Sequence, residues 1–414
     1  MIQFRKMSTI YRSLIDSRLC EDTSQHNLFS LPILLYPTVS WLTLIHMKFT
    51  IARKKFIQAL SFIPSIMERK TTLPVLSHCL IKAEKNTLTI MGTDLDIVIS
   101  EQCQANIEKE GSYCVQGIVL HDIVKRLDTP DVSLSFEDQL FLRSGRSEFR
   151  LPTLSAEQFP DVSQSPLTQK FDLDPQKFKT LINAVRFCAD EEQNNAILNS
   201  VFLHTLNDSG LYTAATNLSQ FAVSRMDLSN SIDLGNGLLL GQKALNEIVR
   251  LLDNSVQSFT LGISNARIQC DIITEGLSIM FTSRLVDGLY PDYQHEMILP
   301  KHKVVMDRSI LLHALERMMV IVDPKLKGIE LNFTDKILTL SVSNIDSGSG
   351  KEELEISWKY DPLMIQFNIF NLIGILQGLS VDKIEIYVAS ATDAMHIKPV
   401  DSAYPHYLLM PLVD

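Results

Sequence analysis

The sequence predicts an α+β protein of three tandem domains, each built from two βαβββ units. Its first sign is a recurring pattern: an alternating apolar strand, an amphipathic helix of 10–15 residues, then three further alternating strands. Composition agrees, because 414 residues with 45% hydrophobic and 21% charged residues are typical of a globular chain. A prior of roughly 150 residues per domain allows two to four domains.

Six units fill residues 47–414. They begin at the segments MKFTIA, SYCVQG, QKFDLD, GLLLG, KVVMD and LMIQFN. Two units supply two helices and two small sheets, which is enough for one α+β domain of about 120 residues. The predicted domains are therefore 47–167, 168–299 and 300–414.

The spacing of apolar residues identifies the helices. The apolar stripes follow the i, i+3, i+4, i+7 pattern and consist of Phe178, Leu181, Ile182 and Val185 in one helix and Leu245, Ile248, Val249 and Leu252 in another. Lys243, Glu247 and Arg250 are expected on the opposite, solvent-facing side of the second helix. Asp174-Pro175 and Asp307 are candidate N-terminal caps.

Alternation and turn chemistry identify the strands. The segments CLIKAEKNTLTIMG, FLHTLNDSGLYTAAT and GIELNFTDKILTLSV read as hairpins with polar turns in the middle.

Residues 1–46 differ from the rest. Residues 23–46 contain no Asp, Glu, Lys or Arg, and the stretch from Leu28 is long enough to suggest a membrane anchor or signal segment. Pro32 and Pro37 weaken that interpretation. The alternative is a leader or a mis-assigned N-terminal extension, with Met47 as the true start, because organised sequence begins abruptly there.

Charge is distributed unevenly over the repeat. Removing the four basic and three acidic residues of 1–46 leaves 34 basic and 45 acidic residues, a net charge of −11, yet the helices are basic. If the helices share one side of the molecule, their basic faces form a positive surface suited to the phosphates of a polyanion. Aromatic residues do not interleave with these charges, which argues against stacking on single-stranded bases.

Several chemistries find no support in the sequence. The six cysteines show neither zinc-finger spacing nor a disulfide framework, which favours a reducing cytosol. DSGSGKEE at 346–353 lacks the first glycine and the Ser or Thr of a phosphate loop. Asp94 and Asp96 are better explained by turn chemistry than by metal binding. No metal or cofactor is expected.

Local motifs carry a resemblance to a known family. They are MKFT at the start of the repeats, TLPVL at 72–76, GTDLD at 92–96, RSGRSEF at 143–149 followed by TLSAEQFPD, FTSRLVDGLYPDY at 281–293 and YLLMP at 407–411. Together they span nearly all of 47–414, and the chain resembles the bacterial sliding clamp, the β subunit of the replicative DNA polymerase.

The resemblance implies a head-to-tail homodimer closed into a ring around duplex DNA, with helices lining the hole. It implies a cytoplasmic, non-catalytic processivity factor without a cofactor. The implied partners are double-stranded DNA held without sequence preference, the replicative polymerase catalytic subunit, the clamp loader, and repair polymerases and other proteins with a clamp-binding motif.

The resemblance also implies three sets of site residues. The partner-peptide pocket would comprise Leu198, Thr216, Leu218, Ser219, Gln220, Phe221, Pro291, His295, Leu408, Leu409, Met410, Pro411 and Leu412. The DNA-facing residues would be Arg53, Lys70, Lys179, Arg186 and Lys243. The subunit interface would set Arg146, Phe149 and Leu151 of one chain against Val320 and Ile321 of the other.

The chain departs from the family pattern at three points. TNLSQF at 216–221 stands where clamps usually have Thr-Asp-Gly-His-Arg-Leu, which bears on peptide specificity. Asn195, Ala196 and Ile197 replace the usual basic and aromatic residues before Leu198, and Glu148 replaces a usual basic residue.

Other interpretations stay open. They are a divergent clamp paralogue or a membrane-tethered interaction protein with altered partner specificity, and an enzyme on a repeat scaffold.

Overall fold

The structure is a computed structural model that describes residues 46–67, 73–161, 166–190, 195–206, 209–229 and 232–412. Residues Leu44–Asp414 form one compact unit. The expectations for residues 1–45 and for Lys70 lie outside the described residues. Within the described ranges, no helix is long and apolar enough to cross a membrane.

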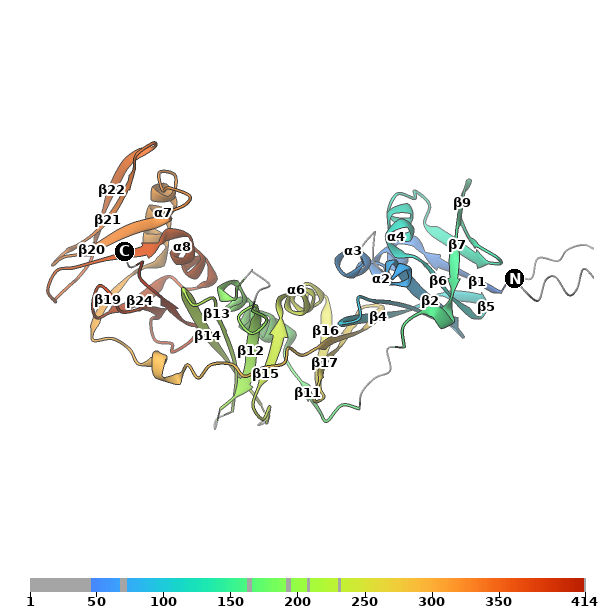
Figure 1. Cartoon of the computed structure of the whole chain (residues 1–414). Helices are drawn as coiled ribbons and strands as arrows, with labels where there is room; N and C mark the ends of the chain where they lie inside the picture. The colour runs from blue at the N-terminus through green and yellow to red at the C-terminus, as the bar shows by residue number, and fades with distance from the viewer. Residues whose placement is uncertain are drawn as a thin grey trace, which may run out of the picture. The chain divides into compact units, whose positions relative to one another are not determined.

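The chain follows the repeat through three domains (Figure 1). The first contains β1 Met47–Ala52, α2 Arg53–Ala59, α3 Ile63–Ile66, η2 Pro74–Ser77, β2 His78–Glu84, β3 Thr87–Thr93, β4 Ile97–Gln104, β5 Asn106–Lys109, β6 Gly111–Gln116, α4 Gly117–Lys125, β7 Asp131–Phe136, β8 Leu140–Ser144, β9 Ser147–Leu151, β10 Thr153–Ser155 and η3 Ala156–Gln158. The second contains β11 Gln169–Asp172, α5 Pro175–Asn183, η4 Arg186–Cys188, β12 Ser200–Thr205, β13 Gly210–Thr216, β14 Gln220–Asp227, β15 Leu238–Gly241, α6 Gln242–Leu251, β16 Val256–Ile263, β17 Arg267–Thr274, β18 Leu277–Arg284 and η5 Gln294–Met297. The third contains β19 His302–Asp307, α7 Arg308–Met319, β20 Gly328–Phe333, β21 Ile337–Asn344, β22 Gly348–Glu355, β23 Leu363–Asn368, α8 Ile369–Gly378, β24 Lys383–Val388, β25 Met395–Pro399 and β26 His406–Leu409.

This order confirms the predicted repeat, with two additions in the first domain, the short strands β5 and β10. The predicted helix length of 10–15 residues is wrong for three helices, since α2 has 7 residues and α4 and α5 have 9 each. In the first unit, Pro64 sits at the start of a separate four-residue helix, α3, because proline lacks the N–H that would continue the helix before it.

Four antiparallel sheets organise the strands. Their orders are β5-β1-β7-β8-β9, then β10-β6-β2-β3-β4-β18-β17-β16-β11, then β15-β12-β13-β14-β26-β25-β24-β19, and β22-β21-β20-β23. Two of the sheets run across a domain junction. Strand β4 pairs with β18 between the first and second domains, and β14 pairs with β26 between the second and third.

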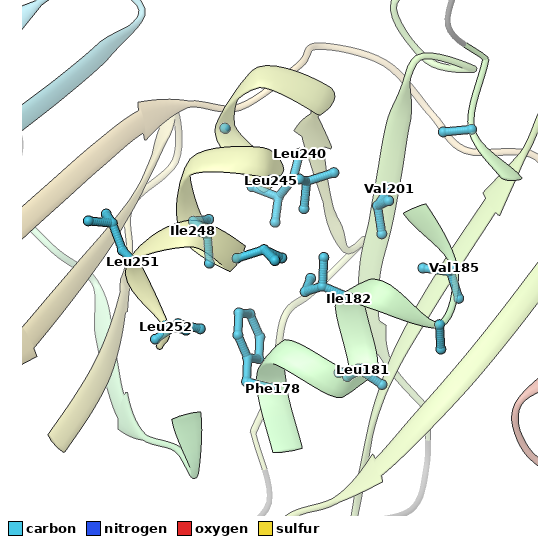
Figure 2. Packing of buried hydrophobic residues seen from close by; sticks show 14 of the residues in the cluster. Phe178, Leu181, Ile182, Val185, Val201, Leu240, Leu245, Ile248, Leu251 and Leu252 are labelled. Atoms are coloured by element: carbon cyan, nitrogen blue, oxygen red, sulfur yellow. The ribbon is translucent and has the colours of Figure 1, made fainter. Parts of the chain in front are cut away.

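A pair of helices covers the sheets in each domain, and the core lies between helices and strands. Figure 2 shows this in the second domain, where Phe178 and Ile182 of α5 gather with Leu245 and Ile248 of α6. All four side chains are fully buried, as the stripes predicted. Each such burial stabilises the fold by roughly 1.5–3 kcal/mol relative to an exposed side chain.

One predicted cap forms and the other does not. Asp174 Oδ1 accepts hydrogen bonds from the backbone N–H groups of Gln176 (2.9 Å) and Lys177 (2.8 Å). Asp307 precedes α7 but its side chain makes no capping bond. Instead the first N–H of α7, at Arg308, donates to the carbonyl of Asp382 (2.8 Å), so the residue just before β24 satisfies that donor.

The predicted position of Glu247 is also wrong. It is buried, with 5% of its surface exposed, and its Oε2 accepts a hydrogen bond from Arg250 Nε at 2.9 Å. A helical period read from one element cannot show which other elements cover its polar side.

Candidate functional site

The turn between β13 and β14, residues 216–220, is held by its own polar side chains. Thr216 Oγ1 donates to the carbonyl of Gln220 (2.8 Å) and accepts from Leu218 N–H (3.0 Å). Asn217 Oδ1 accepts from the N–H groups of Ser219 (3.1 Å) and Gln220 (3.0 Å). These bonds hold Leu218 at φ +69°, a left-handed conformation that non-glycine residues rarely adopt, with 70% of its surface exposed.

The first domain contains the same turn between β3 and β4. Thr93 Oγ1 donates to the carbonyl of Ile97 (2.8 Å), and Asp94 Oδ1 accepts from Asp96 N–H (3.1 Å) and Ile97 N–H (2.7 Å). Leu95 has φ +84° at the position equivalent to Leu218. This confirms turn chemistry for Asp94, and it shows that this turn accepts leucine where glycine would be unstrained.

Strand pairing brings the C-terminal segment against this turn. In the β14–β26 ladder, Phe221 lies opposite Leu408 and Gln220 opposite Leu409, and Met410 N–H donates to the carbonyl of Ser219 (2.9 Å). Since alternate side chains face opposite sides of a sheet, Phe221 and Leu408 share one face.

Of the predicted pocket residues, Gln220 and Leu409 face the other side. Leu409 belongs to the hydrophobic core, and Gln220 Nε2 donates to the carbonyl of Phe187 (3.2 Å). Both therefore support the strand rather than line the pocket.

Exposed apolar side chains surround this junction. Leu218, Met410 and Leu412 are 70%, 46% and 38% exposed, while Leu408 beside them is 4% exposed. Pro411 is buried. The residues of the predicted pocket therefore present a partly exposed apolar surface on a sheet whose backbone is fixed by strand pairing.

The segment after β18 lies against this apolar surface, on the side of Phe221. The ring of Tyr293 lies 4.9 Å from that of Phe221, and its hydroxyl is 2.7 Å from His204 Nε2. Burial lowers the pKa of His204 to about 4, so this imidazole is neutral at pH 7. Pro291 and His295, both exposed, flank Tyr293 in this segment.

Leu198 lies at the end of a turn before β12. Asn195 Oδ1 accepts from the N–H groups of Ile197 (3.0 Å) and Leu198 (3.3 Å), and the carbonyl of Leu198 accepts from Asp190 N–H (2.9 Å). Sequence reasoning missed Asn217, Tyr293 and His204. Tyr293 lay within the motif FTSRLVDGLYPDY, which was the available signal, whereas nothing in the sequence pointed to His204.

Three of the basic residues predicted to face DNA have structural partners. Arg53 donates from Nε to the carbonyl of Val124 (3.1 Å) and from its terminal nitrogen to that of Lys125 (2.7 Å). Arg186 donates to Asn246 Oδ1 (2.7 Å), and Lys243 forms an ion pair with Asp94 across the first domain junction.

Lys179 is half-buried on α5, with Lys177 exposed beside it. Lys54 and Lys55 on α2 are exposed as well.

The predicted subunit-interface residues lie beside two edge strands: Arg146, Phe149 and Leu151 on or next to β9, and Val320 and Ile321 at the end of α7, which packs against β22. Strand β9 ends one sheet and β22 ends another. Phe149 on β9 is 36% exposed, and Val320 at the end of α7 is 80% exposed. A hollow of about 480 Å³ beside β9 is lined by Val119, Ile123, Arg146 and Phe149 among others.

Glu148 on β9 is paired within its own sheet. Its carboxylate lies 2.9 Å from Arg143 and 3.1 Å from Arg150, and the hydrogen bond from Arg143 is the main cause that lowers the pKa of Glu148. On β22, both oxygens of Glu352 accept from Arg317 at 2.7 and 2.6 Å.

Three tandem α+β domains joined edge to edge, with paired helices and exposed apolar side chains at the second junction, define a clamp-type scaffold protein. Family models for the N-terminal, central and C-terminal domains of the DNA polymerase III beta subunit match residues 47–163, 172–292 and 297–413. The chain belongs to this family, whose members are the bacterial sliding clamps.

Individual relatives agree. The chain is 30% identical over 375 residues to the beta sliding clamp of Caulobacter vibrioides and 29% identical to that of Proteus mirabilis, covering 88% of this chain and all of each relative. A crystal structure of the sliding clamp from Bartonella birtlesii bound to griselimycin matches with a TM-score of 0.84 and 29% identity, covering 89% of this chain and all of that one.

These comparisons assign the chain the function of a sliding clamp for DNA polymerase III. They favour neither alternative, the divergent paralogue or the membrane-tethered interaction protein. By family the chain is a non-catalytic processivity factor.

Proposed function

We propose that two copies of this chain close head to tail around duplex DNA and that polymerases and other DNA-processing proteins dock on the pocket at the β14–β26 junction. The observation that carries the docking role is the cluster of exposed apolar side chains, Leu218, Met410 and Leu412, on a rigid strand-paired backbone. A crystal structure of the Caulobacter crescentus clamp, described as having PEG bound at its putative beta-motif tethering region, supports a tethering site in such proteins.

The occupant would be a short peptide with leucine and aromatic anchors. An apolar side chain that becomes fully buried contributes roughly 1.5–3 kcal/mol, so two or three anchors reach micromolar affinity after the cost of association. The clamp loader, the replicative polymerase catalytic subunit and repair polymerases are the partners proposed from the family, in a cytoplasmic setting.

The charges of two sheet-edge strands, β9 and β22, support the dimer. Residues 143–150 carry three arginines and one glutamate, whereas residues 351–355 carry one lysine and three glutamates. In the described residues, β9 and β22 each have a strand partner on one side only. An unpaired strand edge offers backbone hydrogen bonds to another chain, and opposite charges favour this pairing over self-association of like edges.

The helices would bind DNA through its phosphates and would not recognise its base sequence. Lys54, Lys55 and Lys177 are exposed on α2 and α5. Few contacts to phosphates, in a chain of net charge −10, suit a ring that must slide.

The docking role is tested by removing exposed side chains that pack against little else. The probe is a fluorescent, uncharged decapeptide with leucine and phenylalanine anchors, and its binding is measured by anisotropy. The double variant Leu218→Ser/Met410→Ser should bind it at least tenfold more weakly, because two apolar contacts with the peptide are lost. Deleting the last strand is a poorer test, since β26 pairs on both sides and its loss would unfold the third domain.

Ile345→Ser serves as the matched control, because Ile345 is fully exposed at the β21–β22 turn, away from the pocket residues in the sheet order. The control should keep wild-type peptide affinity. Equal peptide affinity in the double variant and the control would contradict docking at this pocket.

A further inference from the structure

The first domain junction repeats the backbone of the second, where the predicted pocket lies. Both contain the same turn, with a leucine in the left-handed conformation, before the strand that pairs across the junction. At the second junction, the N–H of Met410 donates to the carbonyl of Ser219 (2.9 Å). At the first junction, the N–H of Arg284 donates to the carbonyl of Asp96 (3.0 Å). Arg284 is therefore the counterpart of Met410, and Asp96 is the counterpart of Ser219.

The equivalence extends to the strand and helix beside each junction. The N–H of Leu412 donates to the carbonyl of Gln366 on β23 (2.8 Å), just as the N–H of Val286 donates to the carbonyl of Leu239 on β15 (2.9 Å). Each of these strands runs directly into a helix, β23 into α8 and β15 into α6. The first turns of α6 and α8 therefore occupy equivalent places at the two junctions.

The side chains at these equivalent positions differ in charge. The second residue of α8 is Phe370, which is 42% exposed, whereas the second residue of α6 is Lys243. Lys243 forms an ion pair with Asp94, and Arg284 Nη1 lies 3.5 Å from Asp96 Oδ1. These two contacts, the junction ion pairs, join the second domain to the first. The counterparts of all four residues at the second junction are uncharged.

A cavity of about 320 Å³ lies at the first junction. The four residues of the junction ion pairs all line it, together with Asn199, Val286 and others. In the turn, Leu95 is 47% exposed, as its counterpart Leu218 is at the second junction. The first junction therefore has the turn, the exposed leucine and the hollow of a docking site, but charged residues line that hollow.

We propose that the junction ion pairs exclude peptides with apolar anchors from the first junction, so that each chain docks one such peptide, at the second junction. This inference rests on the proposed docking function and identifies residues that decide where a partner binds. An apolar anchor at the first junction would take charged groups out of water without offering them hydrogen bonds, which is unfavourable. At the second junction the same anchor covers apolar side chains, which is favourable.

The test counts peptides bound per full chain by isothermal titration calorimetry with the uncharged decapeptide. The wild-type chain should bind one. The exchanged chain carries the second junction's residues at the first, and should bind two. Its substitutions are Asp94→Asn, Asp96→Ser, Lys243→Phe and Arg284→Met, which leave the net charge unchanged. Asparagine keeps an oxygen that can accept the N–H groups now bound by Asp94, so the turn keeps its shape.

The added site is located by making the same exchange in the Leu218→Ser/Met410→Ser chain, whose own docking site is weakened. The exchange should restore one bound peptide, more weakly than in wild type, because Thr282 stands where Leu408 lies at the second junction. A smaller exchange, Asp96→Ser/Arg284→Met, alters only exposed side chains and should give a weaker added site.

The matched control is Lys82→Phe/Glu84→Ser. It replaces an exposed ion pair of 2.8 Å on β2, away from the residues that line the cavity, and adds the same apolar side chain. The control should bind one peptide per chain. Thermal unfolding checks that each variant is folded.

Two peptides bound by the wild-type chain would overturn the exclusion while leaving the docking function intact. So would a folded set of exchanged chains, large and small, that gains no binding. A second peptide bound by the control would also overturn it, because any exposed phenylalanine would then suffice. A wild-type chain that binds no peptide would overturn the docking function itself.

Discussion

Glu101, on β4, places a carboxyl group in an apolar environment at the first domain junction. It is fully buried, and neither of its oxygens has a hydrogen-bond partner among described residues. In the sheet it lies opposite Ile279 on one side and Ile90 on the other. Desolvation raises its pKa to about 8, and the charge of Arg250 opposes that shift only in part. Glu101 is therefore largely protonated at pH 7.

This pKa predicts how stability depends on pH. An unfolded glutamate has a pKa of about 4.3, so the folded state binds this proton more tightly. The stabilisation is fully present below that value, falls as the pH rises toward about 8, and is lost above it. Glu101→Gln should abolish this fall, so the free energy of unfolding of the variant should exceed that of wild type by a few kcal/mol at pH 8.5. Urea unfolding at pH 5.5, 7 and 8.5 measures the effect.

Glu275→Gln, at an exposed turn, is the control and should keep the wild-type pH slope. Parallel slopes for Glu101→Gln and wild type would show that Glu101 is charged in the folded protein.

At the level of elements, the three domains tie their two helices together in a similar way. Arg53 begins α2 and binds carbonyls at the end of α4, and Arg308 begins α7 and binds the carbonyls of Leu376 (3.1 Å) and Val381 (2.8 Å) at and after the end of α8. In the second domain, Gln176 Nε2 donates to the carbonyl of Asp253 (2.9 Å) just after α6. A cationic donor suits these carbonyls because helix C-termini are partly negative.

Arg53 is therefore expected to act on stability more than on DNA. Arg53→Ala removes two hydrogen bonds from a charged donor and should lower the free energy of unfolding by about 1–3 kcal/mol. Lys54→Ala, on the exposed neighbour, should change it by less than about 0.5 kcal/mol. Thermal unfolding and retention on nicked circular DNA after loading measure the two effects. An Arg53→Ala protein with normal stability and poor retention would instead support the DNA-facing role predicted from the sequence.

Features set by residues close together in the sequence could be predicted from it, whereas features that depend on contacts with residues distant in the sequence could not. The β20–β21 hairpin alternates along its own strands, so Ile329, Leu331 and Phe333 are buried as expected. The stripe of α5 also repeats within one helix. By contrast, the role of Arg53 depends on carbonyls about 70 residues away, and the buried position of Glu247 depends on what packs around α6.

The residues of the predicted pocket also fall into those that could be predicted from the sequence and those that could not. The resemblance pointed to Phe221 and Leu408, which the β14–β26 register places opposite each other. It could not identify His204, because that side chain reaches the pocket only through the 2.7 Å contact with Tyr293, 89 residues along the chain.

At the scale of the whole molecule, the free edges of β9 and β22 and their opposite charges suit one task, which is to close a ring through contacts between subunits. A tether that slides must be closed by contacts between subunits, since tight contacts to DNA would stop it. The two internal junctions are continuous sheets, formed by β4 with β18 and by β14 with β26. If the subunit contact extends a sheet in the same way, β9 and β22 are two edge strands that could form it. Their opposite net charges favour pairing of β9 with β22 over pairing of either strand with its own copy.

The subunit contact should fail when its apolar centre is made acidic. Phe149→Asp or Val320→Asp places an unpaired charge where the proposed interface excludes water, which should convert the dimer to a monomer in sedimentation measurements at micromolar concentration. Each variant should keep wild-type thermal stability as a monomer, because both side chains are exposed in the single chain. Each should be lost from nicked circular DNA after loading, since an open ring is not topologically linked.

Leu326→Asp, at a residue 73% exposed outside the proposed interface, should remain dimeric and stay on the DNA. A wild-type chain that is already monomeric, or a Phe149→Asp chain that still dimerises, would place the subunit contact elsewhere.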